Sequence, residues 1–151
     1  MMPADLKEFL RALNARGVEF LVVGGYAFGA YTEPRATKGL DIFIRSDEKN
    51  SEALYRALAD FGAPLQNLSP ADFRDGTCFQ LGSPPGRIDI LQQIDGITFD
   101  EARKNHLEAD IEGDIRVAVI SREDLIRNKL ASGREQDLLD VKKLRDSAPP
   151  H

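Results

Sequence analysis

Two aspartates on apolar strands could hold a cation between them. Asp41 alternates with apolar residues in the run 40–44, and Asp89 does so in the run 87–93. This period of two predicts β-strands with one buried face. Carboxylates that face each other repel unless a cation lies between them, and oxygen ligands of this kind suit Mg²⁺. The alternative interpretation is that both side chains are ordinary polar positions facing solvent.

A pair of glycines, Gly24-Gly25, could contribute to an anion site. It follows the β-branched and aromatic run 18–23 and precedes a short helix that we expect to extend through residue 31. Residues without a Cβ allow backbone N–H groups to approach a phosphate at the positive end of a helix. A tight turn without any ligand would use the same two residues.

The elements that must position these residues follow from hydrophobic periodicity and turn signals. Helical spacing of apolar residues alternates along the chain with short β-branched runs, and a Gly/Pro-rich connection at 82–86 favours a hairpin. These patterns predict an α/β (α+β) fold, a mixed central sheet flanked by helices. The other expected helices cover 5–14, 49–61, 99–107, 135–145 and the segment between Ser121 and Gly133, and the other expected strands cover 78–81 and 115–120.

Composition predicts one globular domain over residues 1–146, followed by a frayed tail over 147–151. The chain has 151 residues, and 20 Lys and Arg against 25 Asp and Glu give a net charge of −5. This acidic balance counts against a general nucleic-acid coat protein. The single Cys78 excludes an internal disulfide framework, and we expect it in the core of a cytoplasmic protein. The longest uncharged stretch, 20–32, is too short to span a membrane.

Four segments, taken in their order and on their expected elements, resemble the nucleotidyltransferase superfamily, which has the polymerase beta-like fold. The likeness is to its small bacterial MNT-type and AbiEii-like members and runs from about residue 5 to residue 145. The segments are VGGYA at 23–27, RATKGLD at 35–41, RIDI at 87–90, and LIRNKL at 125–130 with REQDLLD at 134–140.

The resemblance implies that a nucleoside monophosphate passes from an NTP donor to a hydroxyl acceptor, with release of pyrophosphate. It implies Mg²⁺ or Mn²⁺ as cofactor, with Asp41 and Asp89 as catalytic residues and metal ligands. The implied nucleotide-binding residues are Gly24, Gly25, Arg35, Lys38, Lys129 and Asp137. The acceptor, a small molecule, a protein or an RNA, would meet this domain directly or through a homo-oligomer or partner chain, as in toxin–antitoxin-like systems.

One position departs from the family pattern. The superfamily places Asp-x-Asp where this chain has Gly39-Leu40-Asp41, so the first of three metal carboxylates is missing. Gly39 is a natural loss, an engineered or sequencing change, or a position for which a neighbour such as Asp47 substitutes. Impaired transfer follows from the first interpretation, and the alternative function is a degenerate domain that binds a nucleotide or a partner.

Overall fold

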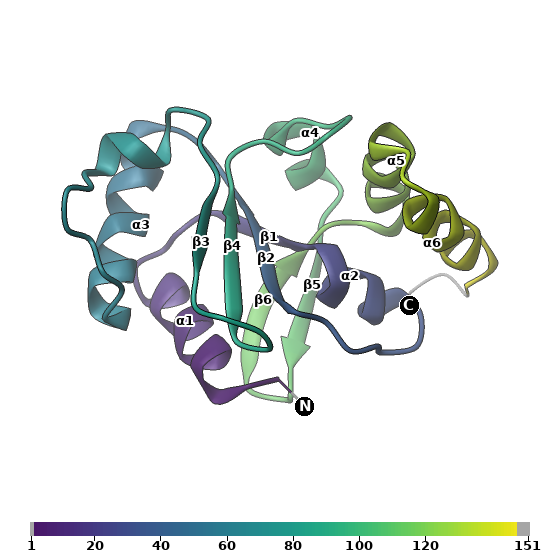
Figure 1. Cartoon of the computed structure of the whole chain (residues 1–151), viewed down its shortest axis with the longest axis horizontal. Coiled ribbons are helices and arrows are strands. Elements are labelled where there is room, and N and C mark those ends of the chain that lie inside the picture. The colour runs from purple at the N-terminus through teal and green to yellow at the C-terminus, as the bar shows by residue number, and fades with distance from the viewer. Residues whose placement is uncertain (1, 148–151) are drawn as a thin grey trace.

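A six-stranded mixed sheet forms the centre of the computed structural model, which describes residues 2–147 (Figure 1). The strand order is β3-β4-β2-β1-β6-β5. The central strands β4 and β2 are parallel, β2 and β1 are antiparallel, and β1 and β6 are parallel. Hairpins close both edges. The strands are β1 (Phe20–Val23), β2 (Gly39–Ile44), β3 (Phe79–Leu81), β4 (Arg87–Leu91), β5 (Leu107–Ile111) and β6 (Ile115–Val119).

Helices flank this sheet, which confirms the fold class predicted from the sequence. Side-chain caps fix several helix starts: the Asp47 carboxylate accepts from the backbone N–H of Asn50, and the Ser121 hydroxyl accepts from that of Asp124. The helices are α1 (Ala4–Ala15), α2 (Gly24–Tyr31), α3 (Glu48–Phe61), α4 (Phe99–Lys104), α5 (Arg122–Ser132) and α6 (Glu135–Asp146), with a 3₁₀ turn at Pro70–Phe73. Of the predicted tail, only Ser147 lies within the described residues.

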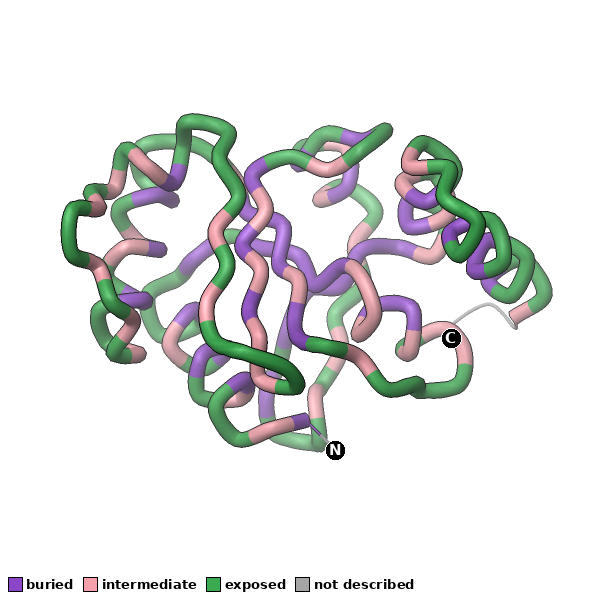
Figure 2. Tube along the Cα trace, viewed as in Figure 1, coloured by how far each residue is buried: buried purple, intermediate pink, exposed green. Residues whose placement is uncertain are grey.

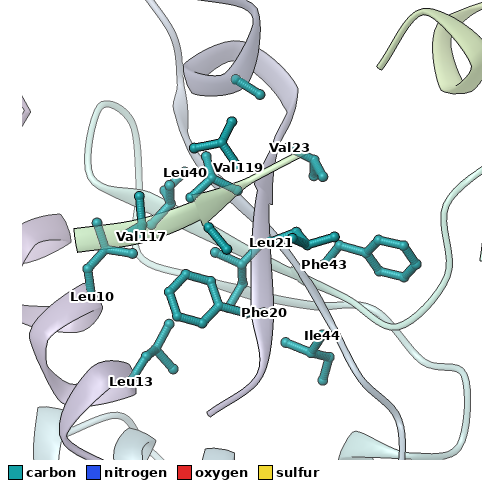
Figure 3. Close-up of a cluster of buried hydrophobic side chains, with 14 of the residues drawn as sticks. Leu10, Leu13, Phe20, Leu21, Val23, Leu40, Phe43, Ile44, Val117 and Val119 are labelled. Atoms are coloured by element: carbon teal, nitrogen blue, oxygen red, sulfur yellow. The ribbon is translucent and has the colours of Figure 1, made fainter. Parts of the chain in front are cut away.

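The core lies between the sheet and the helix pair α1 and α3. Leu10 and Leu13 of α1 lie beside Phe20 of β1 (Figure 3), and Phe9 packs edge-on against Phe61 of α3 at 5.4 Å between ring centroids. Each such side chain stabilises the fold by about 1.5–3 kcal/mol when it leaves water. Figure 2 shows buried positions along the central strands and exposed ones over the loops and the outer sides of α5 and α6.

The opposite face of the sheet carries the remaining helices. Phe43 of β2 packs edge-on against Phe99 of α4, with ring centroids 5.4 Å apart. Because side chains alternate along a strand, Asp41 lies on the same face as Phe43. Helices α5 and α6 pack against each other beside α2, at the right of Figure 1. The Asp41 side chain therefore projects toward the space between the sheet and α5.

Three local predictions were wrong. The helix expected over 99–107 ends at Lys104, and residues from Leu107 form edge strand β5, which the sequence did not indicate. Cys78 is exposed instead of lying in the core. The helical spacing over 135–145 predicts Leu138, Val141, Leu144 or Leu139 on the inward face; Val141 and Leu144 are buried, whereas Leu138 and Leu139 are 50% and 58% exposed. Within residues 2–147, no helix is long and apolar enough to cross a bilayer.

A buried asparagine joins α3 to the ends of β1 and β2. Asn50 accepts from the Glu19 N–H at 2.7 Å and donates to the carbonyls of Glu19 and Arg45 at 3.0 and 2.8 Å. Asn50→Ala should lower the free energy of unfolding by about 2–4 kcal/mol, because three bonds are lost and buried groups stay unpaired. Urea unfolding measures this. The exposed neighbour variant Lys49→Ala should unfold like the wild type, and an equal loss in both would contradict the assignment.

Candidate active site

The parallel pairing of β2 with β4 brings the two candidate carboxylates together. Asp41 and Asp89 are register partners, as are Gly39 and Arg87. Partners on adjacent strands lie about 5 Å apart and project to the same face. The prediction that the two aspartates face each other across the sheet is thus confirmed.

Burial and the neighbouring charge of Asp89 disfavour the ionised form of Asp41. Burial first, then the hydrogen bond and the charge of Asp89, raise the pKa of Asp41 from 3.8 to about 7. The positive charges of Arg87 and Lys129 oppose this shift. Asp89 is held by the Arg87 guanidinium, whose Nη2 donates to Asp89 Oδ2 at 3.0 Å. Near neutral pH, Asp41 is therefore poised between its neutral and charged forms.

The glycine pair lies directly against these residues. Gly24 opens α2 with a φ of +66°, and a Cβ there would lie 2.9 Å from the Asp41 carboxyl carbon. A Cβ on Gly25 would lie 2.8 Å from the Thr37 hydroxyl. A side chain at position 24 would push the start of α2 away from Asp41, and one at position 25 would push it away from Thr37. The two glycines thus allow the N-terminal end of an eight-residue helix, which carries positive partial charge, to approach the carboxylate.

Lys129 approaches the carboxylate pair from α5. It is only 8% exposed, and its Nζ lies 2.9 Å from Asp140 Oδ2 and 3.7 Å from Asp137 Oδ1. The same Nζ lies 5.7 Å from the centre of the Phe28 ring. A buried ammonium needs such partners, because desolvation without them is costly. Helix α6 therefore fixes the position of Lys129 through these two carboxylates.

Arg35 is part of the same cluster. Its guanidinium makes a bidentate contact with Asp140, 2.9 Å at each nitrogen, and lies 4.0 Å over the Phe28 ring. Burial would raise the pKa of Asp140, but hydrogen bonds from Arg35, Lys129 and Gln136 hold it well below its ordinary value. Asp140 is thus a charged anchor between the loop before β2 and α6. In this structure Arg35 holds that anchor, while Lys38 is exposed in the same loop.

The neighbouring carboxylate, Asp137, faces both Lys129 and solvent-exposed Arg134. Arg134 Nε donates to Asp137 Oδ2 at 2.7 Å, and this bond lowers the pKa of Asp137 below its ordinary value. The structure buries Asp137 at 3% exposure on the wall of a pocket.

A pocket of about 270 Å³ lies between these groups. Gly24 and Asp41 line one wall, and Lys129 and Asn128 of α5 line the facing wall. The segment that follows β4 lines a further side of the pocket. The remaining lining residues are Val23, Leu91, Gln93, Ile94, Asp95, Leu125, Ser132, Arg134 and Asp137. The pocket brings the glycine turn, one carboxylate and one buried lysine into one polar space, which suits a charged ligand.

The site holds fewer carboxylates than a paired-metal centre requires. In residues 2–147, no three Asp, Glu, His or Cys side chains form a group that could hold a metal ion. Asp47 caps α3 and does not replace the missing ligand. A Cβ on Gly39 would overlap the Arg87 carbonyl oxygen and would lie 2.8 Å from the Arg87 Cβ. The residues present therefore fit one divalent cation between Asp41 and Asp89, and they do not fit two.

Comparisons with known proteins agree with this architecture. Residues 3–149 match the family described as "Nucleotidyl transferase of unknown function (DUF2204)". The chain belongs to this family, so the predicted nucleotidyltransferase is confirmed. The crystal structure of the lincosamide antibiotic adenylyltransferase LnuA with bound lincomycin is similar, with a TM-score of 0.59 and 17% identity over 96% of this chain and 98% of that chain. At this identity the likeness shows the fold. Among curated proteins, no sequence matches the chain.

Sequence reasoning did not single out Arg87. Its spacing to Asp89, two residues along a strand, places both on one face, and that signal was present in the RIDI segment. Asn128 and Ser132, one helical turn apart on α5, were missed as well. Their contacts are to Asp95, whose carbonyl accepts from Asn128 at 2.9 Å and whose carboxylate accepts from Ser132 at 3.0 Å. No local pattern indicates these contacts, which join segments more than thirty residues apart.

The raised pKa of Asp41 predicts a pH-dependent gain from Asp41→Asn. An acid whose pKa rises from 3.8 to about 7 on folding costs stability as pH increases through this window, and the full cost applies above pH 7. Asp41→Asn should therefore stabilise the fold by up to about 4 kcal/mol at pH 8 and by little at pH 4. Urea unfolding at both pH values measures the difference. The exposed variant Glu52→Gln should show no such gain, and a gain for Asp41→Asn that does not depend on pH would contradict the assignment.

The close contact at Gly39 predicts that this position rejects side chains. Gly39→Ala should lower stability by about 1–3 kcal/mol, because β2 and β4 must separate to admit the Cβ. Gly39→Asp should be at least as unstable. Thermal unfolding tests both. Gly29→Ala is the matched control, since a Cβ there meets Pro34 at an ordinary 3.5 Å; a Gly39→Ala protein as stable as this control would refute the steric argument.

Proposed function

We propose that the chain binds a nucleoside triphosphate in the pocket between Asp41 and Lys129 and transfers its nucleoside monophosphate to a hydroxyl acceptor. The observation that supports this most is the pairing of Asp41 with Asp89 opposite a buried lysine. In the step, the acceptor oxygen bonds to the α-phosphorus while the bond to the pyrophosphate oxygen breaks. Pyrophosphate leaves, and the hydroxyl proton passes to water.

The chain's own residues would bind and orient the donor. Backbone N–H groups at Gly24 and Gly25 would hold phosphate oxygens at the start of α2. Lys129 would contact the phosphates, and Asp137 would keep its ammonium in place. Arg35 would act through Asp140, which it binds, while Lys38 would be a direct phosphate contact in the exposed loop.

Asp41 and Asp89 would hold a single Mg²⁺ or Mn²⁺. When bound, this cation neutralises charge on the triphosphate and supports departure of pyrophosphate. Both carboxylates project from rigid neighbouring strands. Their mutual repulsion, which raises the pKa of Asp41, is what a bound cation would relieve.

The acceptor is a small molecule, a protein or an RNA, and we place the reaction in the cytoplasm. A toxin-like role or a resistance-like role would each fit a small transferase, with a homo-oligomer or a partner chain completing the acceptor side. Lincomycin is one acceptor to include, because the structurally similar adenylyltransferase binds it.

A second candidate is a domain that binds the nucleotide without transferring it. The contact between Gly39 and Arg87 favours this alternative, because it excludes the third carboxylate of the superfamily pattern. Binding and transfer measured on the same protein separate the two candidates.

A label-transfer assay tests the proposal. The chain is incubated with α-labelled NTPs and Mg²⁺ or Mn²⁺, with cellular RNA, protein, small-molecule extract and lincomycin as separate acceptors. Lys129→Met should lower transfer about 10- to 100-fold, because a charged contact to phosphate is lost. Circular dichroism checks that this variant folds, and the exposed Lys142→Met of α6 is the matched control.

Each outcome has a distinct meaning. Labelled acceptor formed by the wild type and by Lys142→Met supports the transferase. NTP binding without any labelled product supports the binding domain. A wild type that neither binds nor consumes NTP contradicts both candidates.

A further inference from the structure

Helix α6 exposes two neighbouring leucines on the side that faces away from the pocket. Leu138 and Leu139 are 50% and 58% exposed, whereas the other side of the helix buries Asp137 and Asp140. A further exposed leucine, Leu130 at 45%, belongs to α5, which packs against α6. Single exposed apolar side chains are common on proteins, but apolar side chains that gather on one element mark interaction surfaces.

A charged residue lies one helical turn beyond each end of the leucine pair. Glu135 precedes it and Lys142 follows it, and both are exposed. The spacing i, i+3, i+4 and i+7 places the four residues on one face of the helix. The ion pairs that α6 makes in the described chain use Asp137 and Asp140 instead. We call the four exposed residues, 135, 138, 139 and 142, the α6 stripe.

The order of residues in the α6 stripe is complementary to itself under a two-fold rotation. When a second copy of α6 lies antiparallel, with the axis between residues 138 and 139, Leu138 meets Leu139 of the second copy. The same rotation places Glu135 opposite Lys142 of the second copy, once at each end. In a two-fold contact every interaction occurs twice. The result is an apolar centre with an ion pair of opposite charges on either side, which is the usual anatomy of an interface.

The charges beside the α6 stripe are compatible with this contact. Arg134 comes opposite Lys143 of the second copy, which are like charges. Arg134 is already paired with Asp137 at 2.7 Å, so its charge is largely offset within its own chain. The remaining repulsion is screened by solvent, because both side chains are exposed.

The exposed edge of the sheet lacks this complementarity. Strand β5 ends the sheet and carries Leu107, which is 38% exposed. The strand contains Glu108 and Asp110 and no basic residue. Two copies paired along β5 would therefore bring like charges together, which is destabilising. Self-association is thus favoured at α6 and not at the sheet edge.

We propose that two copies of the chain associate through the α6 stripe in an antiparallel, two-fold contact. A helix of 12 residues is about 18 Å long, so the interface is smaller than a standard one and the contact is weak. We expect a Kd on the order of 10–100 µM. The inference does not depend on the proposed function, since the stripe residues are not among those that line the pocket.

Sedimentation velocity from about 5 to about 500 µM tests the association. The average mass of the wild type should rise with concentration from the 16.7 kDa of one chain toward twice that value. Leu139→Gln should raise the Kd about tenfold or more, because it removes apolar contact at the centre of the interface from both copies. Glutamine is a good helix former, and circular dichroism checks that α6 is kept.

A reciprocal charge swap tests the pairing itself. Glu135→Lys places lysine opposite Lys142 of the second copy, and Lys142→Glu places glutamate opposite Glu135. Each variant alone should raise the Kd about tenfold, because two attractive pairs become repulsive. An equimolar mixture of the two variants should recover the wild-type Kd within about threefold, since both end pairs are again opposite in charge. A different protein bound to this face would not produce this recovery.

Glu52→Lys and Arg56→Glu are the matched controls. These exposed charges lie one helical turn apart on α3, and both variants should associate like the wild type. A wild type that keeps the mass of one chain at the highest concentration overturns the inference. A dimer that Leu139→Gln leaves unchanged overturns it too, as do charge variants that do not recover when mixed. NTP binding and label transfer are measured separately, so each of these failures leaves the proposed function standing.

Discussion

The register between β2 and β4 is the constraint on which the site depends. A single parallel pairing places Asp41 beside Asp89 and, two residues earlier, Gly39 beside Arg87. Because side chains alternate, a slip of β2 by one residue would turn Asp41 into the core and Ile42 toward the pocket. Burial of the apolar side chains on the other face therefore also fixes the positions of the carboxylates. The sheet that forms the core thereby also determines the geometry of the candidate active site.

A cluster of buried charged residues holds in place the wall of the pocket that faces Asp41. Asp140, 1% exposed, accepts from Arg35 of the loop before β2 and from Lys129 of α5. These contacts join three segments that the sheet does not connect. Removing one partner from such a cluster leaves an unpaired buried charge, which is strongly destabilising. The same carboxylate therefore stabilises the packing of α5 and α6 and holds a lysine opposite Asp41, so local stability and site geometry have a common origin.

Sequence patterns predicted helices, strands and turns correctly where the pattern involves residues that are close together in the chain. The period of two around Asp41, the glycine pair after β1 and the helix expected between Ser121 and Gly133 all depend on neighbouring residues, and the structure has the corresponding strand, turn and helix. Strand β5 was missed because it is an edge strand with little buried surface, and its first residue, Leu107, is 38% exposed. The contact of Arg35 with Asp140 spans 105 residues, and no short-range spacing reports it.

The identity of residue 39 illustrates the difference between a missing ligand and an adapted site. From the sequence alone, an aspartate at this position would be the simplest repair of the superfamily pattern. The backbone argues otherwise, because β2 and β4 approach so closely that a Cβ on Gly39 would overlap the Arg87 carbonyl. A carboxylate here would require a different strand separation, and that would move Asp41 relative to Asp89. The absence of the third carboxylate and the close strand pairing are therefore one structural feature.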